Sequence, residues 1–374
     1  MVVYAQDKKI PCATTAPPKI NPVLKYLPFY KIIKSYKHHA EEITKFLNME
    51  KPSSIIATND RGFYMGYFLE EAGKRGVDTG VLQWALYYPG QQMRPFRGVR
   101  FWRRFAYKWF KPIYVGIRDF IVNLVFHGSS RWTKGIIGGG VAKKMGVINE
   151  LAKKILVKSG VPEKKITVVG YMDFHASRLA KKELDADKKK RAGLFEKYSI
   201  NPNKKNIIYY STPFNRKDTA ILTDKKQHWL TDTIIKTIRE TCEETTHDIL
   251  FKPHPSEKIS AYDWLKQYEV KFMNPLADNN ELIALADLYI AGVSTTNFIP
   301  LSMNKDAIFV NLAHLPQVES AKEYFGVKKF VETREEFRDL LDKFKNGNLE
   351  KQYASGRNII TEDSLNKILA WIEK

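Results

Sequence analysis

The sequence predicts an α/β protein with two domains, each built around a parallel sheet with helices on both faces. The chain has 374 residues, which is more than one hydrophobic core usually serves. Its composition, 44% hydrophobic and 27% charged, is ordinary for a globular protein and excludes a disordered chain. Short apolar runs also alternate with amphipathic helical segments, which is typical of βαβ units.

The alternation is clearest in the second half of the chain. Helices are expected at about 227–244 and 280–286. Right-handed crossovers between such elements give a doubly wound, Rossmann-like domain. The expected strands are 207–210, 248–251, 270–273, 288–291 and 307–310.

The first half is less regular but is also predicted to be α/β. Helices are expected at 65–75 and at 150–159, the second closed by Gly160, and a terminal helix at 361–374. Strands are expected at 54–58, 79–84 and 165–169. The predicted organisation is a first domain at 1–175, a charged linker at 176–195, and a second domain at 196–374 that includes the terminal helix.

The net charge of +20 favours a polyanionic partner, such as a phosphorylated substrate, an anionic membrane face or nucleic acid. The two cysteines, Cys12 and Cys242, are too few for a disulfide framework and lack metal-ligand spacing. The first residues lack the apolar region of a secretory signal, and no run of about 18 apolar residues occurs. We therefore expect a cytoplasmic protein.

Three polar segments follow predicted strands of the second domain. They contain Thr212, the Lys252-Pro253-His254-Pro255 run, and the turn from Ser294 through Thr295 to Thr296. Ligands of open parallel sheets bind beyond the carboxyl ends of the strands, so these segments are expected at one binding edge. Prolines restrict the backbone around His254, and hydroxyls at a helix start lie beside backbone amides that bind phosphate. A helix cap at Ser294 and a structural turn at His254 are the alternatives.

The Lys-Pro-His-Pro and Gly-x-Ser-Thr-Thr motifs, in this order of strands, resemble the nucleotide-binding half of GT-B enzymes. The resemblance covers roughly residues 50–370. It is closest to capsule Kdo and sialic acid transferases, CDP-glycerol glycerophosphotransferases and UDP-N-acetylglucosamine 2-epimerases. It implies that His254 and the residues from Ser294 to Thr296 hold the phosphate of a nucleotide-activated donor. Lys252 and Thr212 are expected to assist.

The first domain carries the candidate acceptor side. Asp60, Arg61 and Gly62 follow one predicted strand, and Gln83 lies at the end of the next. An aspartate at a strand end is a candidate general base toward an acceptor hydroxyl, and a helix cap or an ion pair with Arg61 is the alternative.

The same resemblance helps to choose between two reactions. Asp60 matches an aspartate of the epimerases, but Gln83 occupies the place of their glutamate and cannot take up a proton. No acidic residue occurs from 90 to 118 either. Transfer is therefore preferred to epimerisation. Neither a metal nor a cofactor is expected, because Lys252, His254 and a helix start can neutralise the leaving phosphate.

Residues 94–118 alternate basic and aromatic side chains. The three- and four-residue spacing predicts an amphipathic helix that lies in an anionic membrane interface. An ordinary packed helix is the alternative, and nucleic acid is not the expected partner because no recognition motif accompanies the segment. The membrane-binding candidates are Arg100, Trp102, Arg103, Arg104, Phe105, Lys108, Trp109 and Phe110.

The leading hypothesis is a glycosyltransferase, or a phosphosugar or polyol transferase, of cell-surface glycan assembly. Asp60 and His254 are its candidate catalytic residues. It would use a nucleotide-sugar donor and a glycan or lipid-linked acceptor, on the inner face of the membrane. The alternatives are a nucleotide-sugar epimerase or hydrolase, and a non-catalytic basic binding module.

Overall fold

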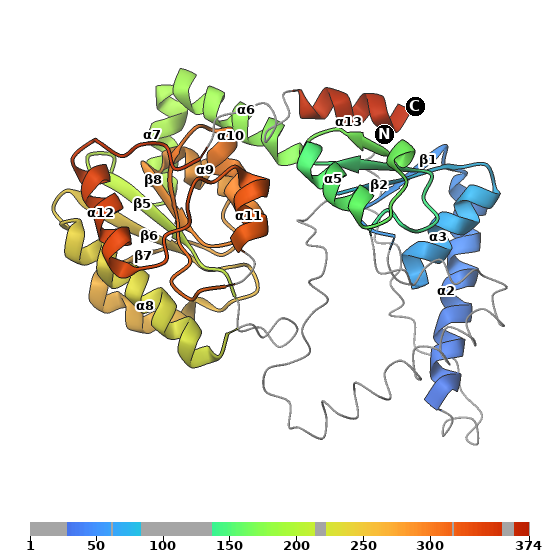
Figure 1. Cartoon of the computed structure of the whole chain (residues 1–374), viewed down its shortest axis with the longest axis horizontal. Helices are drawn as coiled ribbons and strands as arrows, with labels where there is room; N and C mark the ends of the chain where they lie inside the picture. Colours follow the sequence, from blue (N-terminus) through green and yellow to red (C-terminus); the bar gives the residue numbers. More distant parts are fainter. Residues whose placement is uncertain are drawn as a thin grey trace.

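The computed structural model describes residues 28–60, 63–83, 137–213, 222–315, 318–353 and 363–373. Two parallel sheets lie in separate lobes, and helix α6 (Met172–Ala186) runs between them (Figure 1). The predicted α/β class is confirmed.

The second sheet is doubly wound, as predicted. In the described part of the chain its strands follow the order β7-β6-β5-β8-β9, and every neighbouring pair is parallel. The chain starts at the centre with β5, proceeds outward on one side, and then crosses to the other side. The strands are β5 (Lys205–Tyr210), β6 (His247–Lys252), β7 (Lys271–Phe272), β8 (Leu288–Ala291) and β9 (Asp306–Phe309).

Both faces of this sheet are buried, because successive strand residues point to opposite faces and most of them are apolar. Ile208 and Tyr210 join a core with α6, α9 (Asn279–Leu285) and α10 (Phe298–Ser302). Ile207 and Tyr209 join a second core on the other face. That core is covered by α8 (Asp224–Thr241), the 3₁₀ helix η4 (Ile259–Tyr268) and α12 (Arg334–Lys345).

The first sheet has the parallel order β1-β2-β3-β4 in the described residues. The sequence predicted β1 (Ser54–Ala57), β2 (Asp78–Leu82) and β4 (Ile166–Val168), but it did not predict β3 (Lys144–Val147). With a lysine and a glycine among only four residues, β3 lacks the apolar run that marks a strand. Its pairing with both neighbours comes from the tertiary fold.

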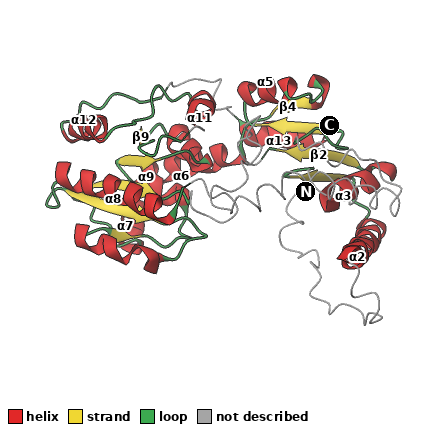
Figure 2. Ribbon diagram, turned by 60° about the horizontal axis from the view of Figure 1, so that its bottom comes forward, coloured by secondary structure: helices red, strands yellow, loops and turns green. Residues whose placement is uncertain are grey.

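Helices α3 (Phe63–Lys74) and α5 (Glu150–Lys158) supply apolar side chains to one hydrophobic cluster of this sheet, which includes Leu69, Leu156 and Val81. Helix α2 (Pro28–Glu50) packs against α3. Helix α13 (Ser364–Glu373), which the sequence placed with the second domain, contacts the first sheet (Figure 2). Its Trp371 lies with Val169, and Lys144 Nζ donates to the Ile372 carbonyl at 3.0 Å.

The segment predicted as a charged linker, 176–195, is helical. It lies within α6 and α7 (Lys188–Lys197), and Asp187 caps α7 by accepting from the Lys190 amide. The rings of Tyr171 and Phe174 contact Phe298, so the start of α6 belongs to the core of the second domain. The charge-rich sequence of this segment thus belongs to two helices, the first of which runs between the lobes.

A second contact joins the two lobes. Helix α11 (Val318–Phe325) places Tyr324, fully buried, among first-domain residues, and the Tyr324 carbonyl accepts from Asn149 Nδ2 at 3.4 Å. Because Ala321 and Phe325 of the same helix lie in the second-domain core, α11 connects two cores.

Candidate functional site

The polar segments predicted after β5, β6 and β8 lie at one edge of the second sheet. Tyr210 pairs with Lys252 at the ends of β5 and β6, and Tyr209 pairs with Ile290 near the end of β8. The strand order reverses between β5 and β8, and ligands of open α/β sheets bind at such a reversal. The prediction that these segments lie at one edge of one sheet is confirmed, and their contact with a ligand stays a prediction.

A hydrogen-bonded cluster joins Ser211, after β5, to the loop that follows β6. The His254 amide donates to Ser211 Oγ and to Glu257 Oε2, both at 2.9 Å. Ser211 Oγ in turn donates to Glu257 Oε2, and Tyr262 OH donates to Glu257 Oε1 at 2.6 Å. This cluster anchors the loop that carries His254.

The ring of His254 is oriented within its own turn. The Ser256 amide donates to Nδ1 at 3.2 Å, and Ser256 Oγ lies 2.8 Å from the same nitrogen. The Glu257 amide closes the turn by donating to the His254 carbonyl at 2.8 Å. Because Nδ1 accepts a hydrogen bond, the neutral ring carries its proton on Nε2, which makes Nε2 a hydrogen-bond donor.

The turn after β8 has hydroxyl groups and backbone amides, but the helix that follows it is short. Ser294 caps the 3₁₀ turn η5 (Thr295–Asn297), and its Oγ accepts from the Thr296 amide at 3.3 Å. Asn297 secures the turn, because its Nδ2 donates to the Gly292 carbonyl at 2.7 Å and its Oδ1 accepts from Tyr289 OH at 3.0 Å. Ser294, Thr295 and Thr296 are all partly exposed.

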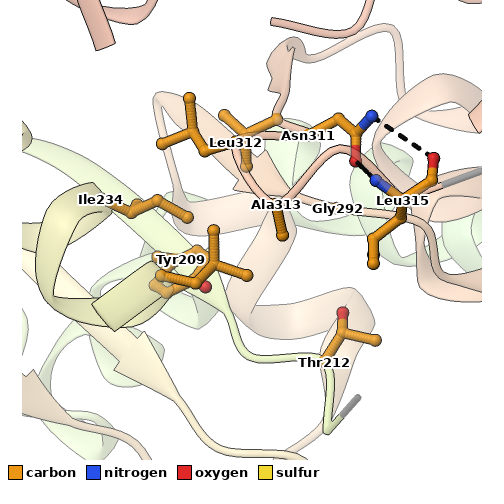
Figure 3. Close-up of a pocket in the computed structure, with 10 residues that line it drawn as sticks. Tyr209, Thr212, Ile234, Gly292, Asn311, Leu312, Ala313 and Leu315 are labelled. Atoms are coloured by element: carbon orange, nitrogen blue, oxygen red, sulfur yellow. Dashed lines mark hydrogen bonds between the residues drawn. The ribbon is translucent and has the colours of Figure 1, made fainter. Parts of the chain in front are cut away.

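Thr212 lies at a pocket beside the reversal point (Figure 3). On the far side the loop after β9 is closed by Asn311, whose Oδ1 accepts from the Leu315 amide at 2.7 Å. The Thr212 carbonyl accepts from Gln227 Nε2 at 3.1 Å, which ties the end of β5 to α8. The lining is mostly apolar: Tyr209, Thr212, Leu230, Ile234, Gly292, Val310, Asn311, Leu312, Ala313 and Leu315.

Lys252 is directed into the protein. It is only 4% exposed, its Nζ donates to the Pro275 carbonyl at 2.8 Å, and its ammonium lies over the ring of Tyr210. Burial lowers the pKa of this ammonium, and the charge of Asp278 opposes the shift. These contacts give Lys252 a structural role at the end of β6, and its contact with a donor phosphate stays a prediction.

In the first domain, Asp60 holds a glycine-rich loop. The carboxylate is 2% exposed, and its two oxygens accept from the Gly138 and Gly140 amides, each at 2.9 Å. Gly138 has φ +77°, which favours glycine, and a Cβ on Gly140 would lie 2.6 Å from Asp60 Oδ2. The run of glycines at 138–140 was a sequence signal for this loop.

Gln83 joins the ends of two strands, because its Oε1 accepts from the Ile148 amide at 3.2 Å after β3. The acceptor-side candidates Arg61 and Gly62 lie outside the described residues, and so does the whole basic aromatic segment 94–118. Within the described parts of the chain, no helix is long and apolar enough to cross a membrane.

Sequence reasoning missed the role of Glu257, which lies two residues after the predicted Lys252-Pro253-His254-Pro255 run. An acidic residue three positions after His254 gives no signal alone, because its partners Ser211 and Tyr262 lie on other elements. The role of Asn297, which directly follows the predicted turn from Ser294 to Thr296, was also missed.

Comparison with known proteins places the fold. No protein-family model matches the chain. No curated protein sequence matches it either. A UDP-GlcNAc 2-epimerase from Methanocaldococcus jannaschii is similar in structure, with a TM-score of 0.54 and 17% identity over 90% of this chain and 82% of the other.

Two further solved structures are similar. The UDP-GlcNAc 2-epimerase from Neisseria meningitidis, bound to UDP-GlcNAc, has a TM-score of 0.54 and 13% identity over 91% of this chain and 82% of its own. The wall teichoic acid polymerase TagF has a TM-score of 0.52 and 12% identity over 85% of this chain and 71% of its own. The chain therefore has the two-domain, GT-B-like Rossmann fold that its motifs predicted.

Proposed function

We propose that this protein is a transferase that uses a nucleotide-activated sugar, or a related phosphosugar or polyol donor, in the synthesis of a surface glycan. The observation that carries the proposal is that Ser211, the His254 turn and the turn at 294–296 all follow strands at the carboxyl edge of one sheet, whose strand order reverses between β5 and β8. Similarity to a structure bound to UDP-GlcNAc and to a teichoic acid polymerase supports the choice of donor class.

The proposed chemistry follows from the orientation of these groups. His254 Nε2 would donate to a phosphate oxygen of the donor, and the hydroxyls and amides of Ser294, Thr295 and Thr296 would bind the same phosphate group. Such donors stabilise the negative charge that develops on the leaving phosphate when the bond to the sugar breaks. Thr212, at the neighbouring strand end, would contact the donor beside them.

Asp60 is the proposed base on the acceptor side, held in place by the Gly138 and Gly140 amides. In this role the carboxylate would take the proton of the acceptor hydroxyl as the hydroxyl attacks the sugar carbon or phosphorus.

Residues 94–118 would bind the anionic membrane surface in which a lipid-linked acceptor lies. Deletion of 99–113 is expected to abolish sedimentation with vesicles of anionic lipid. Unchanged sedimentation of the deletion variant would contradict the membrane part of the proposal and leave the donor site untouched.

The donor site is tested by thermal unfolding in the presence of CMP, CDP, UDP or GDP. A ligand that binds only the native state at a hundred times its Kd stabilises the protein by about 2.7 kcal/mol, so one nucleotide should raise Tm. His254→Ala should lose this rise, whereas the matched variant His314→Ala, at an exposed position, should keep it. If all four nucleotides leave Tm unchanged, the proposal is wrong.

Epimerisation or hydrolysis of a nucleotide sugar is the second candidate, because two of the similar structures are 2-epimerases. This reaction needs no acceptor. Incubation with donor alone, followed by mass spectrometry and NMR, separates the two. Release of free sugar or inversion at its C2 would favour the second candidate, and consumption of donor only with an acceptor favours transfer.

A further inference from the structure

We propose that Glu257 is the positioning residue of the donor site: its carboxylate holds Ser211 and the His254 turn in the arrangement that presents His254 Nε2 to the donor phosphate. This inference rests on the proposed function for the identity of the ligand. The assignment of Glu257 itself comes from its contacts.

The carboxylate joins two neighbours in the sequence, His254 and Tyr262, to Ser211, which lies 46 residues away. Oε2 accepts from the backbone amide of His254 and from the hydroxyl of Ser211 at the end of β5, and Oε1 accepts from the phenol of Tyr262 in η4. Tyr262 is 7% exposed, and burial together with the charge of Glu257 raises the pKa of its phenol, so the phenol remains a donor at neutral pH. Three of the hydrogen-bond sites on the carboxylate are thus occupied by protein groups.

These contacts act on the ring of His254 through the backbone. The amide of His254 donates to Glu257 and to Ser211. The turn is closed by the Ser256 amide, which donates to Nδ1 of His254, and by the Glu257 amide, which donates to the His254 carbonyl. Without the carboxylate, the His254 amide would lose its bond to Glu257 Oε2, and Ser211 Oγ, its other acceptor here, would lose the group to which it donates. The turn would then loosen, and Nδ1 would no longer accept steadily from Ser256.

Charge argues against direct contact between Glu257 and the phosphate. Two anions within a few ångströms repel each other, so a carboxylate that faced the phosphate would weaken binding. Because its oxygens face three donors instead, Glu257 can lie close to a phosphate site and support it without being its ligand.

A positioning role for Glu257 and a direct contact of its charge with the phosphate predict opposite changes in nucleotide affinity for Glu257→Gln. A positioning role requires acceptors on both carboxylate oxygens, and the amide supplies only one. The affinity for the nucleotide that shifts Tm should therefore fall by roughly tenfold in calorimetry, as expected for a disrupted buried hydrogen-bond cluster. Tighter binding on removal of the charge would overturn the positioning role. Glu335→Gln, at an exposed position of α12, is the matched control and should bind as the wild type does.

A double-mutant cycle tests whether Glu257 acts through His254. If it does, Glu257→Ala combined with His254→Ala should bind no more weakly than His254→Ala alone. Additive losses would mean that Glu257 contributes independently of the ring, and the proposal would fall.

A measurement without ligand separates failure of this inference from failure of the proposed function. In protein labelled with ¹⁵N-histidine, the His254 resonances should show an unprotonated Nδ1 and a protonated Nε2 in the neutral ring. Glu257→Ala should average the two nitrogens, while far-ultraviolet circular dichroism shows that the fold is kept. An unchanged tautomer would contradict the positioning role even if nucleotides bind. A shifted tautomer in a protein that binds none of the four nucleotides would retain it and reject the proposed function.

Discussion

Trp371 of the terminal helix lies directly over Gly80 in the first sheet. A Cβ added to Gly80 would lie 2.9 Å from Trp371 Cη2 and 2.8 Å from Ile56 Cδ1, closer than such atoms approach each other. The glycine therefore leaves the space that the indole fills, and this contact docks α13 on a sheet that the chain left some two hundred residues earlier.

Gly80→Ala should destabilise the protein by about 1–3 kcal/mol, because overpacking forces neighbouring side chains or α13 to move. Denaturation by urea, followed by circular dichroism, measures the change. The matched variant is Gly73→Ala in α3, where a Cβ meets nothing within 4 Å. It should stabilise the protein by about 0.4–1 kcal/mol. Equal effects of the two substitutions would show that Trp371 does not occupy this space.

Asp60→Asn should lower the free energy of unfolding by about 1–3 kcal/mol, because the amide nitrogen of asparagine would face a backbone N–H of the glycine loop and leave it without an acceptor. Asp263→Asn, at an exposed aspartate paired with Lys266, is the control and should change stability by less than about 0.5 kcal/mol.

Asp60→Asn also tests the proposed role of Asp60 as the catalytic base. Turnover should be lost even at a temperature where circular dichroism shows the variant to be fully folded. Full turnover in the folded variant would restrict Asp60 to holding the glycine loop.

His247 should make the protein less stable in mild acid. Burial, followed by the charge of Lys205, lowers the pKa of this imidazole below its usual value of 6.5. The unfolded chain therefore takes up the proton first, and stability present above pH 6.5 is lost as pH falls through the lowered pKa, at no more than about 1.4 kcal/mol per pH unit.

The test is the dependence of urea midpoints on pH between 7 and 5. His247→Gln should flatten this dependence, and the exposed His314→Gln should not. A slope that is the same in His247→Gln and in the wild type would assign the acid sensitivity to other groups.

Cys242 should be unreactive in the folded protein. Its side chain is fully buried, and burial raises the pKa of the thiol to about 11, so little of the reactive thiolate exists at pH 8. Iodoacetamide labelling followed by peptide mass spectrometry should find Cys242 modified in 6 M guanidinium but not in buffer. Similar labelling rates in both conditions would contradict the buried placement.

The sequence alone determined the α/β class, the five described strands of the second sheet and the segments of the candidate site. Strands buried on both faces must be continuously apolar, so runs such as 207–210 and 288–291 are visible without a structure. Polar residues that follow such runs must lie at the carboxyl edge, which is why His254 and the turn at 294–296 could be brought together in advance.

Tertiary structure alone decided the rest, because those features depend on partners distant in sequence. The strand β3 forms by pairing with β2 and β4, and α13 docks where its Trp371 packs on Gly80 of β2. The carboxylate of Glu257 gains its role from its contact with Ser211, which lies 46 residues away in the sequence. Local sequence records the periodicity of a segment, whereas hydrogen bonds and packing between remote segments exist only once the chain has folded.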